Sequence, residues 1–248
     1  MRRTSTIVAI AGLIAGSTLL GACTQESATV PLSLKMYIQL SPGQLPAFEE
    51  ARARSIEHRT NNNYPWTEYV AITENNLVRI WVNLDNGWAD VAARRAWFQD
   101  NPVGAAGASP LGGGDLLGTE ISEALPEYSY VPDNPRVPAG EVEFIRETRV
   151  FPSPGNGAGV QETMGAIRDA LQEAGSDQTR YVTRNLIGRG AFSFSVHYMA
   201  SDAADYYASR QAMQPIFDRI QARGNGNARR IRNINWISRD DLHYTPAD

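Results

Sequence analysis

Apolar and polar residues alternate along several short runs of the chain, which is the pattern of half-buried β-strands whose side chains point alternately to two faces. In residues 78–85 the apolar positions are Val78, Ile80, Val82 and Leu84. In residues 192–197 the apolar positions are Phe192, Phe194 and Val196. Both runs are predicted to be strands with one packed face and one polar face.

Between the predicted strands, apolar residues recur every three or four positions, which predicts amphipathic helices. The clearest stripe is formed by Val160, Met164, Ile167, Leu171 and Ala174. A second helix is predicted over residues 202–221, and less regular ones begin near Leu45 and Trp88. Helices therefore alternate with strands in both halves of the chain.

The two halves repeat at an offset of 112 residues. Residues 67–70 are TEYV and residues 179–182 are TRYV (179 − 67 = 112), and the Ser-Pro-Gly of residues 41–43 recurs at 153–155. The apolar faces of the predicted strands agree in phase at this offset, whereas a slip of one residue would exchange the faces. The sequence thus predicts two tandem β-α-β-β-α-β units, which is the ferredoxin-like order.

The fold class predicted from this repeat is α+β, with closing strands at residues 127–131 and 232–237. We expect a first ferredoxin-like repeat over residues 34–131, a linker over residues 132–141 and a second repeat over residues 142–248. The first repeat is expected to carry a Gly/Ala-rich insertion at about 101–126.

The sequence YIQLSPGQLPAF, residues 37–48, in tandem units of this kind resembles the dimeric α+β barrel superfamily. It is most similar to the NIPSNAP-like and antibiotic-biosynthesis-monooxygenase-like members, and the resemblance covers nearly all of residues 34–238. The resemblance implies two sheets packed face to face into a barrel with the helices outside. This chain would form that barrel within itself and is expected to be a monomer, an internal pseudo-dimer.

The resemblance does not imply a haem-degrading activity for this chain. Members that degrade haem use an asparagine in the first strand, a strand tryptophan and a helical histidine. Here the first unit has Gln39 and Trp81, and its second helical segment contains no histidine. No cofactor is therefore predicted.

If the apolar strand faces meet the helices, the polar faces line the space between the two sheets. The candidate ligand-lining residues on these faces are Tyr37, Gln39, Trp81, Asp85, Arg149, Ser195 and His197. Each buried polar atom needs a hydrogen-bond partner, so such a mixture of aromatic and polar side chains favours a pocket or a hydrated cleft over a dry interface.

His197 and Arg149 are the candidate catalytic residues. A histidine with a pKa near neutrality can act as a general base, and the alternative is a structural histidine bonded to a polar neighbour. At the offset of 112 the counterpart of His197 is Asp85. Arg149 could clamp a carboxylate of a ligand, or instead pair with an acid such as Glu147 or Asp85. No metal site is predicted, because the histidines lie far apart in the sequence.

The N-terminus has the order of a bacterial signal peptide, residues 1–22. Arg2 and Arg3 precede an uncharged, mostly apolar run of 14 residues, from Ile7 to Leu20, and about 20 would be needed to span a bilayer. The following Leu-Gly-Ala-Cys resembles a lipobox, which implies lipid attachment at Cys23 with diacylglycerol and an acyl chain such as palmitate. The alternative is an ordinary secretory signal.

Cys23 is the single cysteine of the chain, and residues 23–33 are predicted to be a tether. Several acyl chains on one residue would anchor the protein firmly, since one chain gives only marginal membrane binding. Thr24 is not an aspartate, and in enteric-type bacteria that resemblance implies sorting to the outer membrane. The predicted location is the bacterial cell envelope, lipid-anchored at the outer membrane and facing the periplasm.

The composition is that of a folded domain, with 42% hydrophobic and 20% charged residues. The chain has 23 basic and 27 acidic residues, and without residues 1–22 the net charge is 21 − 27 = −6. This sign excludes nucleic acid as the main partner, because nucleic-acid binding depends on an excess of basic residues.

Three functions are compatible with these features. The leading hypothesis is a lipid-anchored binding or accessory protein that holds a small polar or aromatic ligand between its sheets. The alternative is a cofactor-independent oxygenase or isomerase that uses His197 and Arg149. The third is a protein-interaction module that meets an envelope protein through residues 101–126. The fold does not choose among them, since function resides in sites.

Overall fold

The computed structural model describes residues 29–102, 111–224 and 227–247. Its first half contains β1 (Leu32–Gln39), α1 (Leu45–Asn61), β2 (Glu68–Ile72), β3 (Leu77–Leu84), α2 (Trp88–Asp100) and β4 (Asp115–Ala124). Its second half contains β5 (Phe144–Pro152), α3 (Gly157–Glu173), β6 (Arg180–Gly188), β7 (Ser193–Ala200), α4 (Ala203–Gly224) and β8 (Ala228–Ser238). The predicted signal peptide and Cys23 lie outside the described residues.

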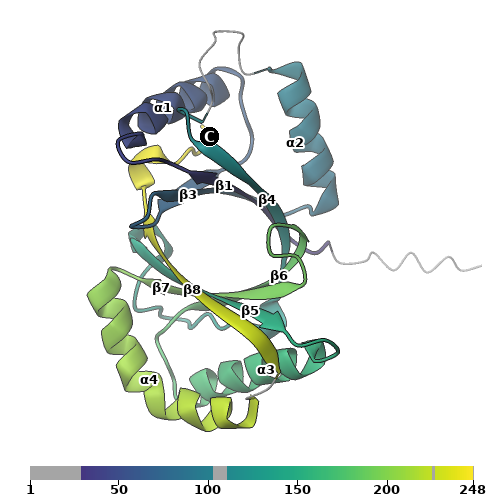
Figure 1. Ribbon diagram of the computed structural model, residues 1–248, viewed down its shortest axis with the longest axis vertical. Coiled ribbons are helices and arrows are strands. Elements are labelled where there is room, and N and C mark those ends of the chain that lie inside the picture. Colours follow the sequence, from purple (N-terminus) through teal and green to yellow (C-terminus); the bar gives the residue numbers. More distant parts are fainter. Residues whose placement is uncertain (1–28, 103–110, 225–226, 248) are drawn as a thin grey trace, which may run out of the picture.

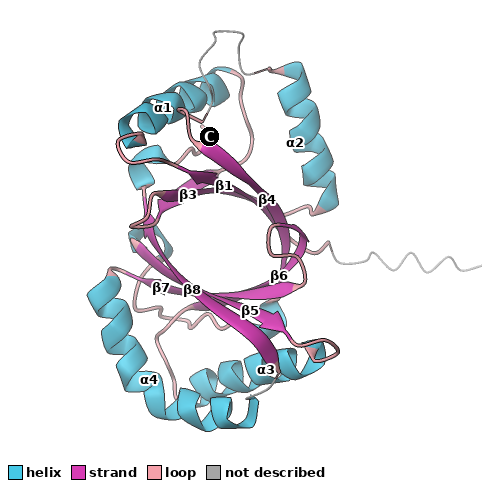
Figure 2. Ribbon diagram, viewed as in Figure 1, coloured by secondary structure: helices cyan, strands magenta, loops and turns pink. Residues whose placement is uncertain are grey.

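The strands close into one antiparallel barrel in the order β1-β3-β2-β8-β5-β7-β6-β4. The two halves join where β2 pairs with β8 and where β4 pairs with β6. Figures 1 and 2 show the barrel at the centre, with α1 and α2 outside the first half and α3 and α4 outside the second. Closure removes free strand edges, which would otherwise invite pairing with other chains. The predicted mixed α+β class is confirmed.

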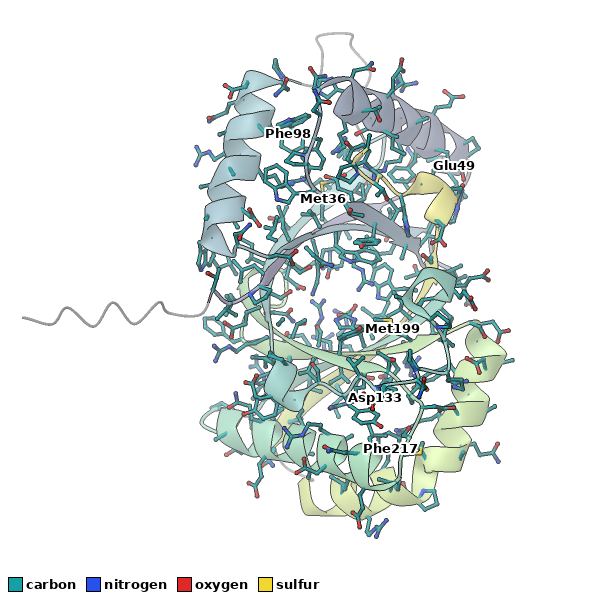
Figure 3. The ribbon with its side chains drawn as sticks, turned by 180° about the vertical axis from the view of Figure 1, so that it is seen from behind. Met36, Glu49, Phe98, Asp133, Met199 and Phe217 are labelled. Atoms are coloured by element: carbon teal, nitrogen blue, oxygen red, sulfur yellow. The ribbon has the colours of Figure 1, made fainter. Side chains whose placement is uncertain are left out.

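The alternation of residues decides which face of each strand meets the helices. On β3, Val78 packs in a cluster with Phe48 of α1, whereas Arg79 and Trp81 face the barrel interior. Figure 3 shows the same division, with Met36 on the side of α1 and Met199 within the barrel. The apolar strand faces therefore bury against the helices and the polar faces form the barrel lining, as the sequence predicts.

The strand predicted at residues 192–197 begins one residue later than expected. Phe192 is 86% exposed and has a φ of 63°, so it belongs to the turn before β7 and not to its apolar face. Its backbone N–H donates to the carbonyl of Asn185 at 3.0 Å, which closes the β6–β7 hairpin. Phe194 and Val196 are buried against α3 and α4, as predicted.

The predicted closing strand at residues 127–131 is wrong, because Pro126–Tyr128 is a short 3-10 helix. The strand that closes the first half is β4, Asp115–Ala124, which pairs with β1 on one side and β6 on the other. This part of the predicted insertion is therefore a barrel strand, and residues 103–110 lie outside the described residues. The error arose because the glycines and prolines before and after β4 are typical of loops.

Gly112 lies where the chain enters β4 and presses on α1. Its φ is 57°, and a Cβ added there would lie 2.4 Å from the Cα of Phe48. The overlap is with helix backbone, which cannot swing away as a side chain can. Glycine is therefore required at this contact.

We expect Gly112→Ala to lower the free energy of unfolding by at least about 2 kcal/mol, because it combines backbone overlap with an unfavourable φ. The matched control is Gly157→Ala at the start of α3, where an added Cβ meets nothing within 4 Å. Urea denaturation of both variants measures the difference. Equal stability of the two variants would show that the segment before β4 can move away from α1.

Candidate functional site

A buried carboxylate, Glu147 of β5, lies at the centre of the barrel interior. Its Oε1 accepts hydrogen bonds from Arg149 at 2.8 Å and from the Ser195 hydroxyl at 3.0 Å. Its Oε2 accepts from Arg79 at 3.0 Å and from the indole N–H of Trp236 at 2.8 Å. Four donors from four strands therefore satisfy this carboxylate.

A second buried carboxylate, Glu120 of β4, shares Arg149 with the first. Arg149 donates to its Oε2 at 2.7 Å, and Tyr37 and Lys35 donate to its Oε1 at 3.2 and 3.3 Å. Arg149 also donates to the Tyr37 hydroxyl at 3.0 Å and to the carbonyl of Arg189 at 3.2 Å. The guanidinium thus makes its hydrogen bonds to protein groups, and these groups fill one end of the barrel.

The charges of this network keep Glu147 ionised although it is fully buried. Burial opposes ionisation, but the cations Arg149, Arg79 and Lys35 outweigh it and hold the Glu147 pKa well below its usual range. Removing any one of them would leave a buried charge less well compensated.

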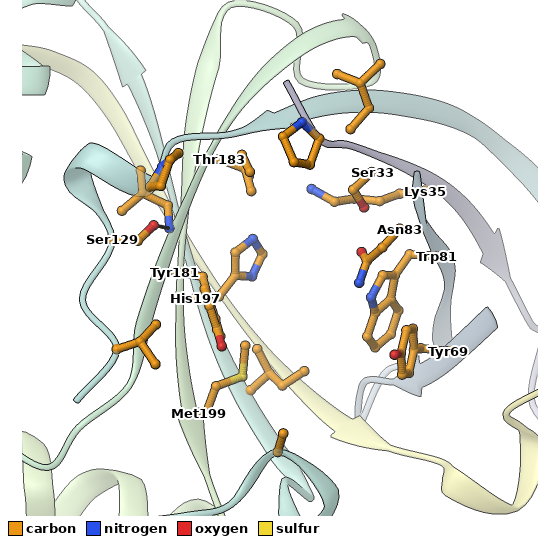
Figure 4. A pocket seen from close by; sticks show the side chains of 18 of the residues that line it. Ser33, Lys35, Tyr69, Trp81, Asn83, Ser129, Tyr181, Thr183, His197 and Met199 are labelled. Carbon is orange, nitrogen blue, oxygen red and sulfur yellow. Dashed lines mark hydrogen bonds between the residues drawn. The ribbon is translucent and has the colours of Figure 1, made fainter. Parts of the chain in front are cut away.

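Beyond the network, the barrel encloses a cavity of about 710 Å³. One wall is formed by β1 and β3 with Ser33, Lys35, Arg79, Trp81 and Asn83, and the other by β6 and β7 with Tyr181, Thr183, His197 and Met199. Figure 4 shows these two walls facing each other across the cavity. Its size lies in the range of pockets that hold small-molecule ligands.

His197 projects from β7 into this cavity (Figure 4). The imidazole makes no hydrogen bond with any residue that the structure describes, although the residue is only 7% exposed. Burial, together with the nearby charges of Lys35, Arg79 and Arg149, lowers the pKa of His197 to about 3. The ring is therefore neutral at physiological pH, with its nitrogens available to a ligand.

Two basic side chains face the cavity from the opposite wall. The guanidinium of Arg79 is sandwiched between two indoles, 4.6 Å from the centre of Trp81 and 4.4 Å from that of Trp236. Lys35 is 4% exposed, and burial lowers the pKa of its amine. Arg79 is consequently a fixed cation, whereas Lys35 can lose its proton more readily than an ordinary lysine.

The mouth of the cavity is aromatic. Tyr69 stacks on Trp81 with ring centres 5.2 Å apart, and Tyr181 lies on the facing wall. A second hollow of about 350 Å³ shares these three residues and extends to Val137 and Gly140 in the segment that joins β4 to β5. The predicted linker, residues 132–141, thus lines the entrance of the barrel cavity.

The structure brings five of the predicted site residues into the interior: Tyr37, Trp81, Arg149, Ser195 and His197. Gln39 lies outside the cavity at the end of β1, where its amide donates to the carbonyls of Leu40 and Asn75. Asp85 follows the end of β3 and lies exposed at the rim of the cavity. Of the two candidate catalytic residues, only His197 lines the cavity.

Asp85 is not the counterpart of His197. Trp81 pairs with Lys35 in β1, and His197 pairs with Glu147 in β5. Lys35 and Glu147 are 112 residues apart, but Trp81 and His197 are 116 apart (197 − 81 = 116). The reason is that the β6–β7 hairpin is four residues longer than the β2–β3 hairpin.

The alternative in which Arg149 pairs with Glu147 is confirmed, since the two side chains bond at 2.8 Å. Sequence reasoning missed Lys35, Arg79 and Glu120 as interior residues. For Lys35 and Arg79 the signal was present, because the alternation that places Tyr37 in the interior places them there too. Glu120 had no signal, since the strand that carries it was expected elsewhere.

A further cavity of about 390 Å³ lies between the sheet and the helices of the second half. Its walls include Arg146, Thr148, Met164, Tyr198, Arg210 and Phe217. Arg180, which also lines it, is 0% exposed and forms no ion pair with any described residue. Its guanidinium donates to the carbonyl of Tyr128 at 2.6 Å.

Within the described residues, no group of three or more His, Cys, Asp or Glu side chains could hold a metal ion. Among these same residues, no helix has the length and apolar character needed to cross a membrane.

The sequence matches no protein-family model and no curated protein. Solved structures do match. An anthrone oxidase-like protein superimposes with a TM-score of 0.59 at 12% identity over 90% of this chain and 95% of that chain. A protein from Fusobacterium nucleatum named a monooxygenase superimposes with a TM-score of 0.58 at 11% identity over 85% and 93%. Chlorite dismutase from Candidatus Nitrospira defluvii superimposes with a TM-score of 0.53 at 9% identity over 86% and 93%.

The chain has a dimeric α+β barrel fold. At these identities of 9–12% the likeness shows the fold alone, so the predicted barrel fold is confirmed. The neighbours carry the names of enzymes, which contradicts the leading hypothesis of a binding or accessory protein. The names favour the alternative, an enzyme of the oxygenase type.

We expect the burial of neutral His197 to make stability depend on pH. Its pKa of about 3 in the folded protein lies below the value near 6.5 in an unfolded chain, so the unfolded state binds the proton better. The stabilisation is complete above pH 6.5 and is lost as the pH falls towards 3. Relative to His197→Gln, the wild type should lose about 2 kcal/mol of its free energy of unfolding between pH 7.5 and pH 5.

Urea denaturation at several pH values measures this difference. The window ends at pH 5 so that buried carboxylates, which titrate at lower pH, do not contribute. If the free energy of unfolding changes with pH in the same way in the wild type and in His197→Gln, then His197 is as easily protonated in the folded protein as in the unfolded chain.

Removing the charge of Glu147 should be severely destabilising. Glu147→Gln keeps the size of the side chain but leaves Arg79 and Arg149 without their shared carboxylate, which we expect to cost about 3–5 kcal/mol. The control is Glu50→Gln on α1, where the exposed pair with Arg54 spans 4.0 Å and should contribute under about 0.5 kcal/mol. Similar denaturation midpoints for both variants would contradict the central role of Glu147.

Proposed function

We propose that this chain is an enzyme of the cofactor-independent oxygenase type, which removes a proton from a small aromatic substrate in the barrel cavity. The observation that carries the proposal is the neutral imidazole of His197, which faces a cavity of about 710 Å³ and has no hydrogen-bond partner among the described residues. A buried base without a protein partner is available to a substrate proton. The enzyme names of the structural neighbours support the same class.

The walls of the cavity suit an aromatic substrate whose anion carries charge on an oxygen. Trp81, Tyr69 and Tyr181 offer flat faces near the entrance, while Ile145 and Met199 are apolar. Arg79 is held in place by its two indoles and by Glu147, so it would meet a developing oxyanion without reorganisation.

In the proposed reaction a ring nitrogen of His197 accepts the proton from a C–H or O–H group of the substrate. The electron pair left behind is delocalised onto the substrate oxygen that faces Arg79. Burial and, to a smaller extent, the nearby cations lower the His197 pKa to about 3, so the ring is a weaker base in the empty cavity than a histidine with a pKa near neutrality. The new negative charge offsets these cations and stabilises the imidazolium as it forms.

Molecular oxygen is the oxidant. The anion formed at a CH2 group bonds to O2, and the imidazolium returns its proton to the resulting hydroperoxide. Loss of water then leaves a carbonyl group, so that one CH2 group and one O2 give one C=O group and one water.

The test is oxygen uptake with anthrone and related enolisable phenols and ketones as probes. We expect turnover by the wild type and a fall in kcat of at least about 100-fold in His197→Gln, the usual range for loss of a general base. Tyr207→Phe, on the exposed side of α4, should leave kcat unchanged. Unchanged turnover in His197→Gln, in protein shown to be folded by circular dichroism, would refute the assignment.

The cavity between the sheet and the helices is the second candidate for the substrate site. The observation that favours it is Arg180, a fully buried arginine without an ion-pair partner among the described residues, which an anionic ligand could supply. Arg210, which lies 3.7 Å from the ring centre of Phe217, lines the same cavity. Loss of oxygen uptake in Arg210→Gln, with full activity in His197→Gln, would show that the reaction takes place in the cavity between the sheet and the helices.

We also propose that the two halves are tandem ferredoxin-like repeats that form the barrel within one chain. The support is the identical order of elements in each half and the hydrogen bond between Tyr37 and Arg149, which are 112 residues apart. In the same proposal Cys23 is the lipid-attachment site that anchors the protein in the cell envelope, supported by the resemblance of residues 20–23 to a lipobox.

A further inference from the structure

Lys35 is the only lysine in the 248 residues of the chain. The total of 23 basic residues therefore includes 22 arginines (23 − 1 = 22), which carry all the other basic side-chain charges. The two residue types differ chemically, because a guanidinium keeps its proton at physiological pH whereas a buried amine can release it. The chain uses lysine at one position only, and that position faces the barrel cavity.

The surroundings of Lys35 leave its amine accessible to a ligand. Its one hydrogen bond to a described residue is to Glu120 at 3.3 Å, a long contact for a charge-assisted pair. The Glu120 carboxylate does not depend on it, since Arg149 and Tyr37 also donate to that group. Figure 4 shows the side chain reaching into the cavity towards the wall that carries His197.

Burial of the amine favours its neutral, nucleophilic form. Lys35 is 4% exposed, and the fixed cations Arg79 and Arg149 lie near enough to oppose a third positive charge. Glu120 and Glu147 act in the opposite direction, and burial outweighs them. Lysines desolvated beside other cations are the ones that attack carbonyl groups.

We propose that Lys35 is a covalent-binding residue that forms an imine with an aromatic aldehyde or ketone in the barrel cavity. The amine lone pair forms a bond to the carbonyl carbon, and the carbonyl oxygen takes a proton. The C–O bond then breaks and water leaves, so that one amine, one carbonyl compound and one proton give one protonated imine and one water. The positive charge of the imine nitrogen lies beside Glu120, which stabilises it.

This inference extends the proposed function by naming a carbonyl compound as the substrate class, and it rests on that function only for the location of the cavity. A protonated imine withdraws electrons and makes the neighbouring C–H group more acidic. With a carbonyl substrate the imine nitrogen therefore accepts the electron pair that the substrate oxygen facing Arg79 accepts in the reaction without an imine. His197, on the facing wall, would then remove that proton. Imine formation itself requires neither turnover nor oxygen.

The experiment traps the imine with benzaldehyde and sodium cyanoborohydride at pH 7, using the full chain. Hydride reduces the C=N bond to a stable secondary amine, and peptide mapping by mass spectrometry locates the added benzyl group. In protein produced without lipid modification, the N-terminal amine is the other primary amine of the polypeptide and serves as the internal reference. An ordinary lysine is less than about 0.1% neutral at this pH.

We expect Lys35 in the folded protein to be benzylated at least about tenfold faster than Lys35 in the same chain unfolded in urea. Protection of Lys35 in the folded protein, or a rate no higher than in urea, would overturn the proposal and leave Lys35 as a structural ammonium group. Both measurements use the wild-type sequence, so neither depends on whether a variant folds.

Lys35→Arg is the matched variant, because it keeps the positive charge beside Glu120 and removes the nucleophile. With a carbonyl substrate its oxygen uptake should fall at least about 100-fold, while the N-terminal amine is trapped as before. Trapping at Lys35 without oxygen uptake would support the imine and refute the proposed oxygenase. Oxygen uptake without trapping at Lys35 would refute the imine and support the oxygenase.

Discussion

The ionised carboxylate of Glu147, buried at the centre of the barrel, constrains the rest of the structure. Its four hydrogen-bond donors come from β3, β5, β7 and β8. One of these donors, Arg149, also bonds to Glu120 of β4 and to Tyr37 of β1. A carboxylate can stay ionised away from water only if its partners are held at hydrogen-bonding distance. The register of these strands is therefore fixed by one polar group as well as by the apolar faces beneath the helices.

The same network separates the paired groups of the interior from the cavity. Arg149, Tyr37 and the carbonyl of Arg189 fill one end with paired groups. The side chains of His197 and Lys35 line the cavity of about 710 Å³. Protein donors satisfy the two carboxylates of the network, whereas the imidazole of His197 and the Nε of Arg79 have no hydrogen-bond partner among the described residues. Structural and chemical roles are thus separated along the barrel axis.

Periodicity in the sequence was sufficient to predict the faces of β1, β3, β5 and β7, because one face of each strand must bury against a helix. The barrel itself was implied by the resemblance of residues 37–48 to the dimeric α+β barrel superfamily. Periodicity also placed Tyr37, Trp81 and His197 in the interior. It could not place β4, where glycines and prolines flank a strand with little alternation, so Glu120 was missed. It named Glu147 and Asp85 as possible partners of Arg149 but could not choose between them, since a partner is decided by three-dimensional proximity and not by spacing.

The four extra residues in the β6–β7 hairpin have a chemical consequence. Because a shift of four residues is even, the same face of β7 stays apolar. The shift makes His197, which pairs with Glu147, the counterpart of Trp81, which pairs with Lys35. Corresponding walls of the cavity therefore differ: one offers an arginine held between indoles, and the other a neutral imidazole. A barrel with two identical halves would place the same group on both walls. General-base chemistry needs the proton acceptor and the group that stabilises the anion to be different and to face each other, and this asymmetry supplies both.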